Sequence, residues 1–232
     1  MLTVHDNADQ AVSGINDDAI VLIGGFGKAG QPVELIEALL RRGSRNLTVV
    51  SNNAGNGTDG LAALIGAGRV AKIICSFPRQ SDSKLFDAKY RAGEIELELV
   101  PQGNLAERIR SAGAGIGGFF TPTGYGTILA AGKETRIIGG RGFVLESPIR
   151  ADFALIKALK ADAVGNLVYR KTARNFGPVM ASAATCTIVQ VSEMVETGDL
   201  DPENIVTPGI FVNGIVVVGP SVRSKPSTEP GL

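Results

Sequence analysis

The run AIVLIGGFGKAGQPVELIEALLRR, which occupies residues 19–42, decides the fold. It starts with a short apolar, β-branched segment and continues with glycines from position 24 to position 30. After Pro32, apolar residues recur at helical spacing. Proline suits a first helical turn, and Gly43 suits the left-handed position that follows a helix. The stretch therefore predicts a strand, a glycine loop and a helix in succession.

The same alternation continues through the rest of the chain. We expect further strands at 47–50, 70–75, 95–100, 153–158, 187–191 and 215–218, and helices at 61–68, 83–93 and 105–110. Asn104 is a candidate N-cap for the last helix, with Glu107 three residues on as in a capping box. The alternation predicts an α/β fold, in which a largely parallel sheet is flanked by helices on both faces and binds ligands at the carboxyl ends of its strands.

Two segments depart from this alternation. Residues 113–142 are rich in glycine and irregular, which indicates loops and a short edge hairpin. Residues 220–232 are polar and contain two prolines, which favours a flexible tail. We therefore expect a single domain over residues 1–219.

Composition excludes several classes of protein. The 232 residues include 30 glycines, well above the usual share of about 7%, but without the three-residue period of collagen. A hydrophobic content of 44% and a mean hydropathy of +0.16 argue against disorder. The 23 basic and 23 acidic residues balance, and no basic block occurs. Nucleic acid and anionic membrane are therefore poor partners.

The location of the protein is predicted from what the sequence lacks. The first ten residues are polar and unlike a secretory signal, and no run approaches 18 apolar residues. Cys75 and Cys186 lie within separate apolar runs, where they are expected to be small buried hydrophobes in a reducing compartment. We expect a cytoplasmic protein.

The first candidate site is the glycine loop, in which Gly25, Gly27 and Gly30 satisfy the pattern G-x-G-x-x-G between a strand and a helix. In dinucleotide-binding proteins this pattern is followed, about 20 residues later, by an acid that binds the ribose. Here the next strand ends at Ser51 and Asn52 instead. A structural tight turn and a loop for a different ligand both remain open.

The second candidate site is formed by amide side chains at predicted strand ends. Asn52 and Asn53 begin the run NNAGNG, in which neutral N–H donors and glycines suit an oxyanion or a thioester carbonyl. An asparagine-stabilised turn is the alternative. Gln102 follows another predicted strand and is a further candidate donor, although a solvated loop residue fits it as well.

Several kinds of chemistry lack the residues they need. His5 is the one histidine in the sequence, so histidine triads and histidine metal sites have no support, and we expect no metal site. Glu146 is the most suggestive carboxylate, but a strand-end glutamate paired with Arg150 or another cation is favoured. No residue is a convincing nucleophile.

Six motifs together resemble a known family. They are DDAIVLIGGFGKAGQP at 17–32, SNNAGNG at 51–57, CSFPRQSD at 75–82, PQGNLAERIR at 101–110, FFTPTGYGT at 119–127 and YRKTARNFGP at 169–178. Through these motifs the chain resembles the A (alpha) subunits of class I coenzyme A transferases, and the resemblance extends to about Gly219. Asp18 departs from the glycine or asparagine usual in the family, but this affects only a turn.

The resemblance implies a fold of the CoA-transferase type and a reaction. CoA would move from succinyl-CoA to 3-oxoadipate, in aromatic degradation by the β-ketoadipate route, with no cofactor other than the CoA that the substrate carries. The family's nucleophile is a glutamate in a Ser-Glu-Asn-Gly motif of the B subunit. That motif is absent here, since the nearest match is Ser192-Glu193-Met194. The resemblance thus implies that the chain is inactive alone and works with a B subunit in a heterodimer or heterotetramer.

The resemblance also assigns roles to residues. Asn52 and Asn53 match asparagines beside the thioester oxyanion, and Gln102 matches a glutamine that lines the same site. The signature loop corresponds to Gly24, Gly25, Gly27 and Gly30.

A dicarboxylic acceptor needs a cation for its distal carboxylate. We expect Arg79 in this role and Arg174 as a weaker choice, while a surface or partner-pairing arginine is the alternative for Arg79.

Two other functions stay open. One is an A subunit that serves acetoacetate, as in succinyl-CoA:3-oxoacid transferases, or short-chain acyl groups. The other belongs to a different class: a regulatory module that binds nucleotide phosphates with the loop GGFGKAG.

Overall fold

An eight-stranded sheet runs through the centre of the fold, in a computed structural model that describes residues 2–219. The strand order is β1-β14-β12-β9-β2-β3-β4-β5, and every neighbouring pair is parallel. The strands are β1 (Thr3–His5), β2 (Ile20–Ile23), β3 (Leu47–Val50), β4 (Val70–Cys75), β5 (Glu96–Leu99), β9 (Ala151–Lys157), β12 (Ala184–Val191) and β14 (Gly214–Val217). The predicted parallel sheet is confirmed; the predicted tail, 220–232, lies outside the described residues.

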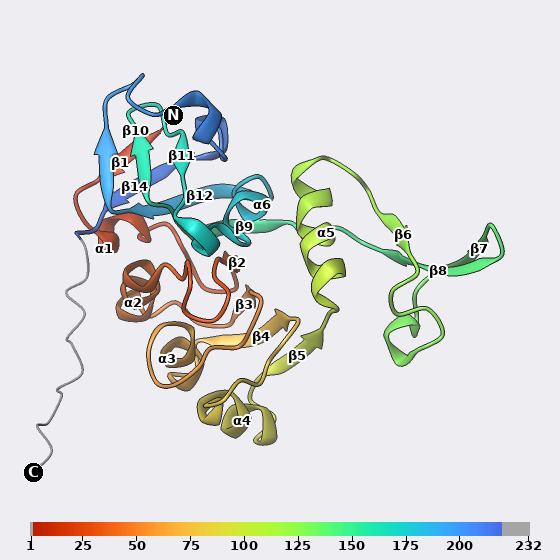
Figure 1. Cartoon of the computed structure of the whole chain (residues 1–232). Coiled ribbons are helices and arrows are strands. Elements are labelled where there is room, and N and C mark those ends of the chain that lie inside the picture. The colour runs from red at the N-terminus through yellow and green to blue at the C-terminus, as the bar shows by residue number, and fades with distance from the viewer. Residues whose placement is uncertain (1, 220–232) are drawn as a thin grey trace, which may run out of the picture.

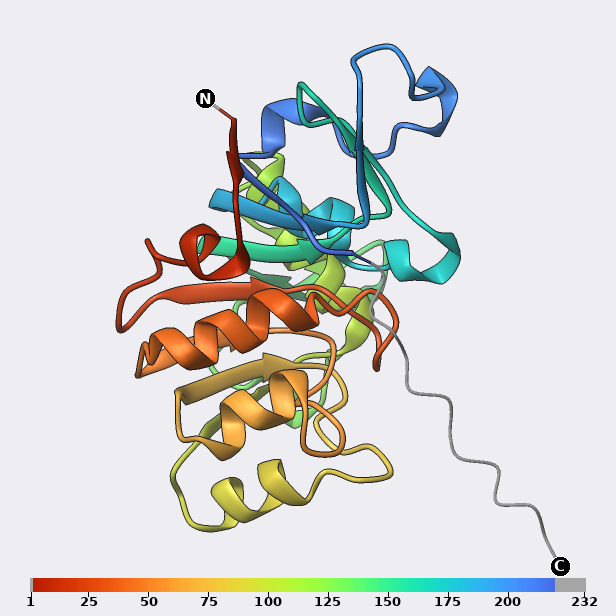
Figure 2. The same ribbon diagram turned by 90° about the vertical axis from the view of Figure 1, so that its left-hand side faces the viewer.

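Helices cover both faces of this sheet (Figure 1). One face carries α1 (Ala8–Ala11), α2 (Val33–Arg42), α3 (Gly60–Gly66) and α4 (Lys84–Arg91), of which α2, α3 and α4 lie side by side in Figure 2. The other face carries α5 (Gln102–Gly113) and α6 (Gly177–Ala181). Val21 packs into the first layer and Leu22 into the second. The central strands read as continuous apolar runs because both of their faces are buried.

The ends of α2 follow the sequence signals, whereas the start of α5 does not. Pro32 directly precedes α2, and Gly43 ends it with φ of 85°. In α5, Asn104 lies inside the helix and is buried, and its Nδ2 donates to Glu146 Oε1 over 3.1 Å. The predicted capping box was therefore wrong: a buried carboxylate holds Asn104, and Glu107 pairs with Arg110 instead.

Residues 119–146 form a separate antiparallel sheet that projects from the body, here called the arm (Figure 1). Its strands, in the order β6-β8-β7, are β6 (Phe119–Thr121), β7 (Thr135–Ile138) and β8 (Arg141–Glu146). The hairpin expected within residues 113–142 is present between β7 and β8, but it belongs to a separate three-stranded sheet and not to an edge of the central sheet.

The remaining elements are short. A second small sheet, in the order β11-β10-β13, comprises β10 (Lys160–Asp162), β11 (Leu167–Val168) and β13 (Glu193–Val195). Four 3-10 turns within residues 2–219 are η1 (Ile128–Ala130), η2 (Lys171–Arg174), η3 (Pro202–Asn204) and η4 (Gly209–Phe211). No helix in this range is long and apolar enough to cross a membrane. In the same range, no group of three His, Cys, Asp or Glu side chains is arranged to hold a metal ion.

A buried ionic cluster joins the arm to α5. Glu146 is 2% exposed, and its Oε1 accepts hydrogen bonds from Lys133 Nζ at 2.8 Å and from Asn104 Nδ2 at 3.1 Å. Arg108 Nε lies 3.7 Å from its other oxygen. The hypothesis that Glu146 pairs with a cation is confirmed, and the cations are Lys133 and Arg108, while Arg150 forms no ion pair with it.

The two cysteines are expected to differ in reactivity. Cys75 is fully buried at the end of β4, and burial raises the pKa of its thiol to about 12. Cys186 is half-buried, and burial also raises its pKa. Because the thiolate is the reactive form, a raised pKa keeps both thiols protonated at pH 8. We expect a disulfide reagent at pH 8 to modify Cys186 slowly and Cys75 only after denaturation. Modification of both residues at the denatured rate would contradict this, and a Cys186→Ser variant isolates Cys75.

Candidate functional site

The sequence-predicted site residues gather at one edge of the sheet. The glycine loop follows β2, Asn52 and Asn53 follow β3, and Gln102 opens α5 just after β5. Parallel strands place these carboxyl ends along the same edge, where α/β sheets bind ligands. Gln102 Nε2 donates to Asn52 Oδ1 over 2.8 Å, so two residues 50 positions apart in sequence are in direct contact.

Asn52 is held so that its amino group is free. The residue is 2% exposed, and its Oδ1 accepts from Ser76 Oγ at 2.8 Å and from Gln102 Nε2 at 2.8 Å. Both acceptor positions of the amide oxygen are thereby occupied. Within the described part of the chain, Asn52 Nδ2 donates no hydrogen bond. The two contacts therefore fix the orientation of the Asn52 Nδ2 group, which remains available as a hydrogen-bond donor.

Asn53 is fixed in a similar way. It is also 2% exposed, and its Oδ1 accepts from the backbone N–H of Gly55 over 2.9 Å, which closes an asparagine turn. Its Nδ2 has no acceptor among residues 2–219. The alternative of a stabilised turn is thus present, but it uses only the oxygen and leaves the amino group open.

The glycine loop is anchored by the segment that precedes α6. Phe26 and Ala29 exchange backbone hydrogen bonds of 2.9 and 3.2 Å across the tip. Asn175 Nδ2 donates to the carbonyl of Ala29 at 2.9 Å. Gly30 has φ of 74°, and a Cβ there would overlap the carbonyl oxygen of Ala173. The loop and the segment 170–175 therefore form one packed unit.

Replacement of Gly30 by alanine is expected to destabilise the chain more than replacement of Gly27. Both residues have positive φ, which costs an alanine about 1–2 kcal/mol. A Cβ at Gly27 meets nothing within 4 Å, whereas at Gly30 it collides with the backbone of Ala173. Urea unfolding of the two variants measures the difference. Equal losses of unfolding free energy would show that this packing contributes nothing.

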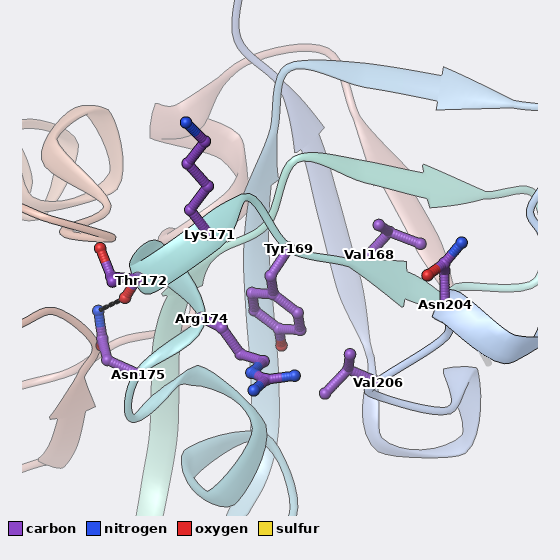
Figure 3. Close-up of a pocket in the computed structure, with 8 residues that line it drawn as sticks. All are labelled: Val168, Tyr169, Lys171, Thr172, Arg174, Asn175, Asn204 and Val206. Atoms are coloured by element: carbon purple, nitrogen blue, oxygen red, sulfur yellow. Dashed lines mark hydrogen bonds between the residues drawn. The ribbon is translucent and has the colours of Figure 1, made fainter.

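The predicted arginines lie in different surroundings. Arg79 Nε binds Asp87 Oδ1 at 2.6 Å, and its guanidinium lies 5.8 Å from the centre of the Tyr90 ring. Arg174 belongs to η2 and lines a cavity of about 770 Å³ together with Tyr169 and Val206 (Figure 3). Lys171 extends away from Arg174 in that view. Arg79 thus already has an acidic partner, and its role toward a substrate stays a prediction.

A second cavity lies at the carboxyl edge on the other side of β2. Its volume is about 380 Å³, and its walls come from the glycine loop, the ends of β9 and β12, and η2 with its N-cap Arg170. The residues that line it include Lys28, Glu34, Lys157, Arg170, Lys171 and Gln190. Lys28, Arg170 and Lys171 belong to two of the sequence motifs, at 17–32 and 169–178, but sequence analysis did not group them with Lys157, because these residues are separated along the chain.

A family model described as coenzyme A transferase matches residues 5–218. The chain belongs to the coenzyme A transferase family. Among relatives, it is 63% identical to the A subunit of 3-oxoadipate CoA-transferase from Pseudomonas putida, over 95% of this chain and 96% of that protein. Identity to the protein of the same name from Acinetobacter baylyi is 66%, over 90% and 92% of the two chains.

Members with other names are less similar. A Bacillus subtilis protein, named as the probable A subunit of succinyl-CoA:3-ketoacid coenzyme A transferase, is 48% identical over 92% of this chain and 89% of its own. Among solved structures, an acyl-CoA transferase of Escherichia coli O157:H7 matches 94% of this chain with a TM-score of 0.84 at 23% identity. The chain spans about half the length of that structure, 47%, and the likeness supports the CoA transferase fold.

Proposed function

We propose that the chain is the A subunit of a transferase that moves CoA from succinyl-CoA to 3-oxoadipate, which yields 3-oxoadipyl-CoA and succinate. Identity to two relatives named for 3-oxoadipate exceeds identity to the relative named for 3-ketoacids. The observation that carries the chemistry is the pair Asn52 and Asn53, whose amide oxygens are tied and whose amino groups are open.

The asparagine pair would act on the thioester oxygen. When a nucleophile adds to a thioester carbonyl, negative charge develops on the oxygen, and fixed N–H donors stabilise it without reorganising. The Nδ2 groups of Asn52 and Asn53 provide such donors at the carboxyl edge. Gln102 positions Asn52, because its Nε2 donates to Asn52 Oδ1.

The nucleophile would come from a B subunit that carries Ser-Glu-Asn-Gly, since this sequence lacks that motif. The partner's glutamate attacks the carbonyl carbon of succinyl-CoA, and the C–S bond breaks. This step forms a succinyl-glutamyl anhydride and releases the CoA thiolate. The thiolate then attacks the glutamyl carbonyl, which releases succinate and forms a glutamyl-CoA thioester. A carboxylate of 3-oxoadipate attacks this thioester, and the same two steps in reverse give 3-oxoadipyl-CoA. No metal or redox cofactor takes part.

The experiment is reconstitution. The chain is assayed alone, with a co-expressed Ser-Glu-Asn-Gly partner, and with a variant of that partner in which alanine replaces the glutamate. We expect 3-oxoadipyl-CoA only from the intact pair, and a covalent CoA adduct on the partner's glutamate by mass spectrometry. Transfer by the chain alone would contradict the shared site.

The same assay separates the alternatives. A larger kcat/KM for acetoacetate than for 3-oxoadipate would favour a 3-oxoacid transferase. Nucleotide binding by the isolated chain, without transfer in the mixture, would favour a regulatory module. The mass of the purified complex distinguishes the proposed heterodimer from a heterotetramer.

A further inference from the structure

The cavity of about 380 Å³ beside the glycine loop is lined by more cations than acids. Lys28, Lys157, Arg170 and Lys171 face it, against one acidic residue, Glu34, among the described residues that form its walls. These residues are here called the cationic pocket. Glu34 accepts a hydrogen bond from the buried Gln190 Nε2, which occupies part of its carboxylate.

Three of these cations have no acidic partner in the part of the chain that the structure describes. Lys28 pairs with Asp59 at 3.0 Å. Lys157, Arg170 and Lys171 form no ion pair among residues 2–219. Lys157 is also half-buried at the end of β9. A half-buried cation without a counter-charge is unfavourable by itself and becomes favourable when an anion binds beside it.

The pocket and the asparagine pair lie at the same carboxyl edge of the sheet, on either side of β2. Asn52 follows β3 and Lys157 ends β9, and two strand spacings, or about 10 Å, separate the axes of these strands. Lys157 lies on the α2 side of the sheet beside Gln190, whereas Asn52 contacts Gln102 of α5. A substrate that engages both sites therefore has to pass over the carboxyl edge beside the glycine loop.

We propose that the cationic pocket binds the distal carboxylate of a dicarboxylic acyl substrate, with Lys157 and Arg170 as its principal donors. This rests on the proposed function, in which both succinyl-CoA and 3-oxoadipate carry a second carboxylate. The pocket therefore makes the enzyme selective for dicarboxylic acids. Arg79 and Arg174 do not line it.

The test uses the complex of this chain with its B subunit. Two acceptors are compared that differ only at the distal end: 3-oxoadipate, and 3-oxohexanoate, in which a methyl group replaces that carboxylate. In ping-pong kinetics, kcat/KM for the acceptor reports only the half-reaction that uses it. We expect Lys157→Met and Arg170→Met each to lower kcat/KM for 3-oxoadipate about 10- to 100-fold, the range of one charge-assisted hydrogen bond. The value for 3-oxohexanoate should stay within about threefold.

Control variants test the location of the effect. Lys160→Met removes a lysine that pairs with Glu193 at 3.0 Å and does not line the pocket, so it should leave both acceptors unchanged. Equal losses on both acceptors from Lys157→Met and Arg170→Met would overturn the proposal. A selective loss in Arg79→Met with none in Lys157→Met and Arg170→Met would assign the role to Arg79 and would also overturn it.

The phosphates of CoA are the rival anion. Kinetics with succinyl-CoA and with succinyl-pantetheine, which lacks every phosphate of CoA, separate the two sources. If the penalty of Lys157→Met for the donor disappears with succinyl-pantetheine, the pocket binds phosphate and the proposal fails. A penalty that is equal for both donors supports the carboxylate.

A binding measurement keeps this proposal separate from the proposed function. Adipate should raise the melting temperature of the wild-type complex more than hexanoate does, and Lys157→Met should abolish the difference. If the wild-type complex shows this difference but does not turn over 3-oxoadipate, the proposed function fails and the pocket stands. Equal shifts with adipate and hexanoate in the wild type would overturn the pocket itself.

Discussion

Replacement of Asn52 by alanine is expected to lower kcat of the reconstituted complex about 10²- to 10³-fold, the usual loss for one oxyanion donor. The reason is geometric: Ser76 and Gln102 hold the amide oxygen of Asn52 and direct its Nδ2 outward. Alanine keeps the backbone and removes the donor. Steady-state kinetics with saturating succinyl-CoA and 3-oxoadipate measure the effect.

Asn56→Ala provides the matched control for that variant. Asn56 lies in the same loop, but its Oδ1 accepts from the backbone N–H of Asp82 at 2.9 Å and from Ser81 Oγ at 3.5 Å, and within residues 2–219 its side chain forms no hydrogen bond with Asn52 or Asn53. It should therefore retain nearly full kcat. If Asn52→Ala and Asn56→Ala lose kcat equally, the loss comes from a disturbed loop, and Asn52 has no direct part in the reaction.

Glu146→Ala is expected to destabilise the chain by about 3 kcal/mol, because removal of one partner of a buried ion pair leaves uncompensated charge. Glu146 is 2% exposed, and its loss leaves Lys133 and the Asn104 amide without their acceptor between the arm and α5. For a chain of this size the melting temperature should fall by roughly 6–12 °C. Calorimetry of the purified chain measures both quantities.

Glu134→Ala is the control from the same arm. Its ion pair with Arg136 is exposed on both sides, and such pairs contribute at most about 1 kcal/mol. Both variants remove one glutamate charge from an ion pair, so the difference between their losses of unfolding free energy measures the effect of burial. A small loss in Glu146→Ala, equal to that in Glu134→Ala, would contradict the view that the ionic cluster attaches the arm.

The sequence predicted features that depend on neighbours along the chain. Central strands such as β2 are buried on both faces and appear as unbroken apolar runs, and Gly43 ends α2 where a left-handed residue is needed. The carboxyl-edge cluster also followed from local order, since a parallel sheet places the ends of β2, β3 and β5 together. Asn52 and Gln102 could therefore be grouped before their contact was known.

Features that depend on residues far apart in the sequence could not be predicted from local patterns. Asn104 and Glu107 have the spacing of a capping box, yet the buried carboxylate of Glu146 attracts Asn104, and no short window contains both residues. The cationic pocket has the same character, because its walls come from the glycine loop, the ends of β9 and β12, and η2, which are separated along the chain.

The strand order has a consequence for the time course of folding. Strands β2 to β5 succeed one another along the chain, so this half of the sheet can form as soon as its residues leave the ribosome. The pairing of β2 with β9 is distant: Ile20 and Asp152, which share a hydrogen bond of 2.8 Å, are 132 residues apart. Contacts of such long range form slowly. We therefore expect the asparagine pair to be in place before the cationic pocket closes.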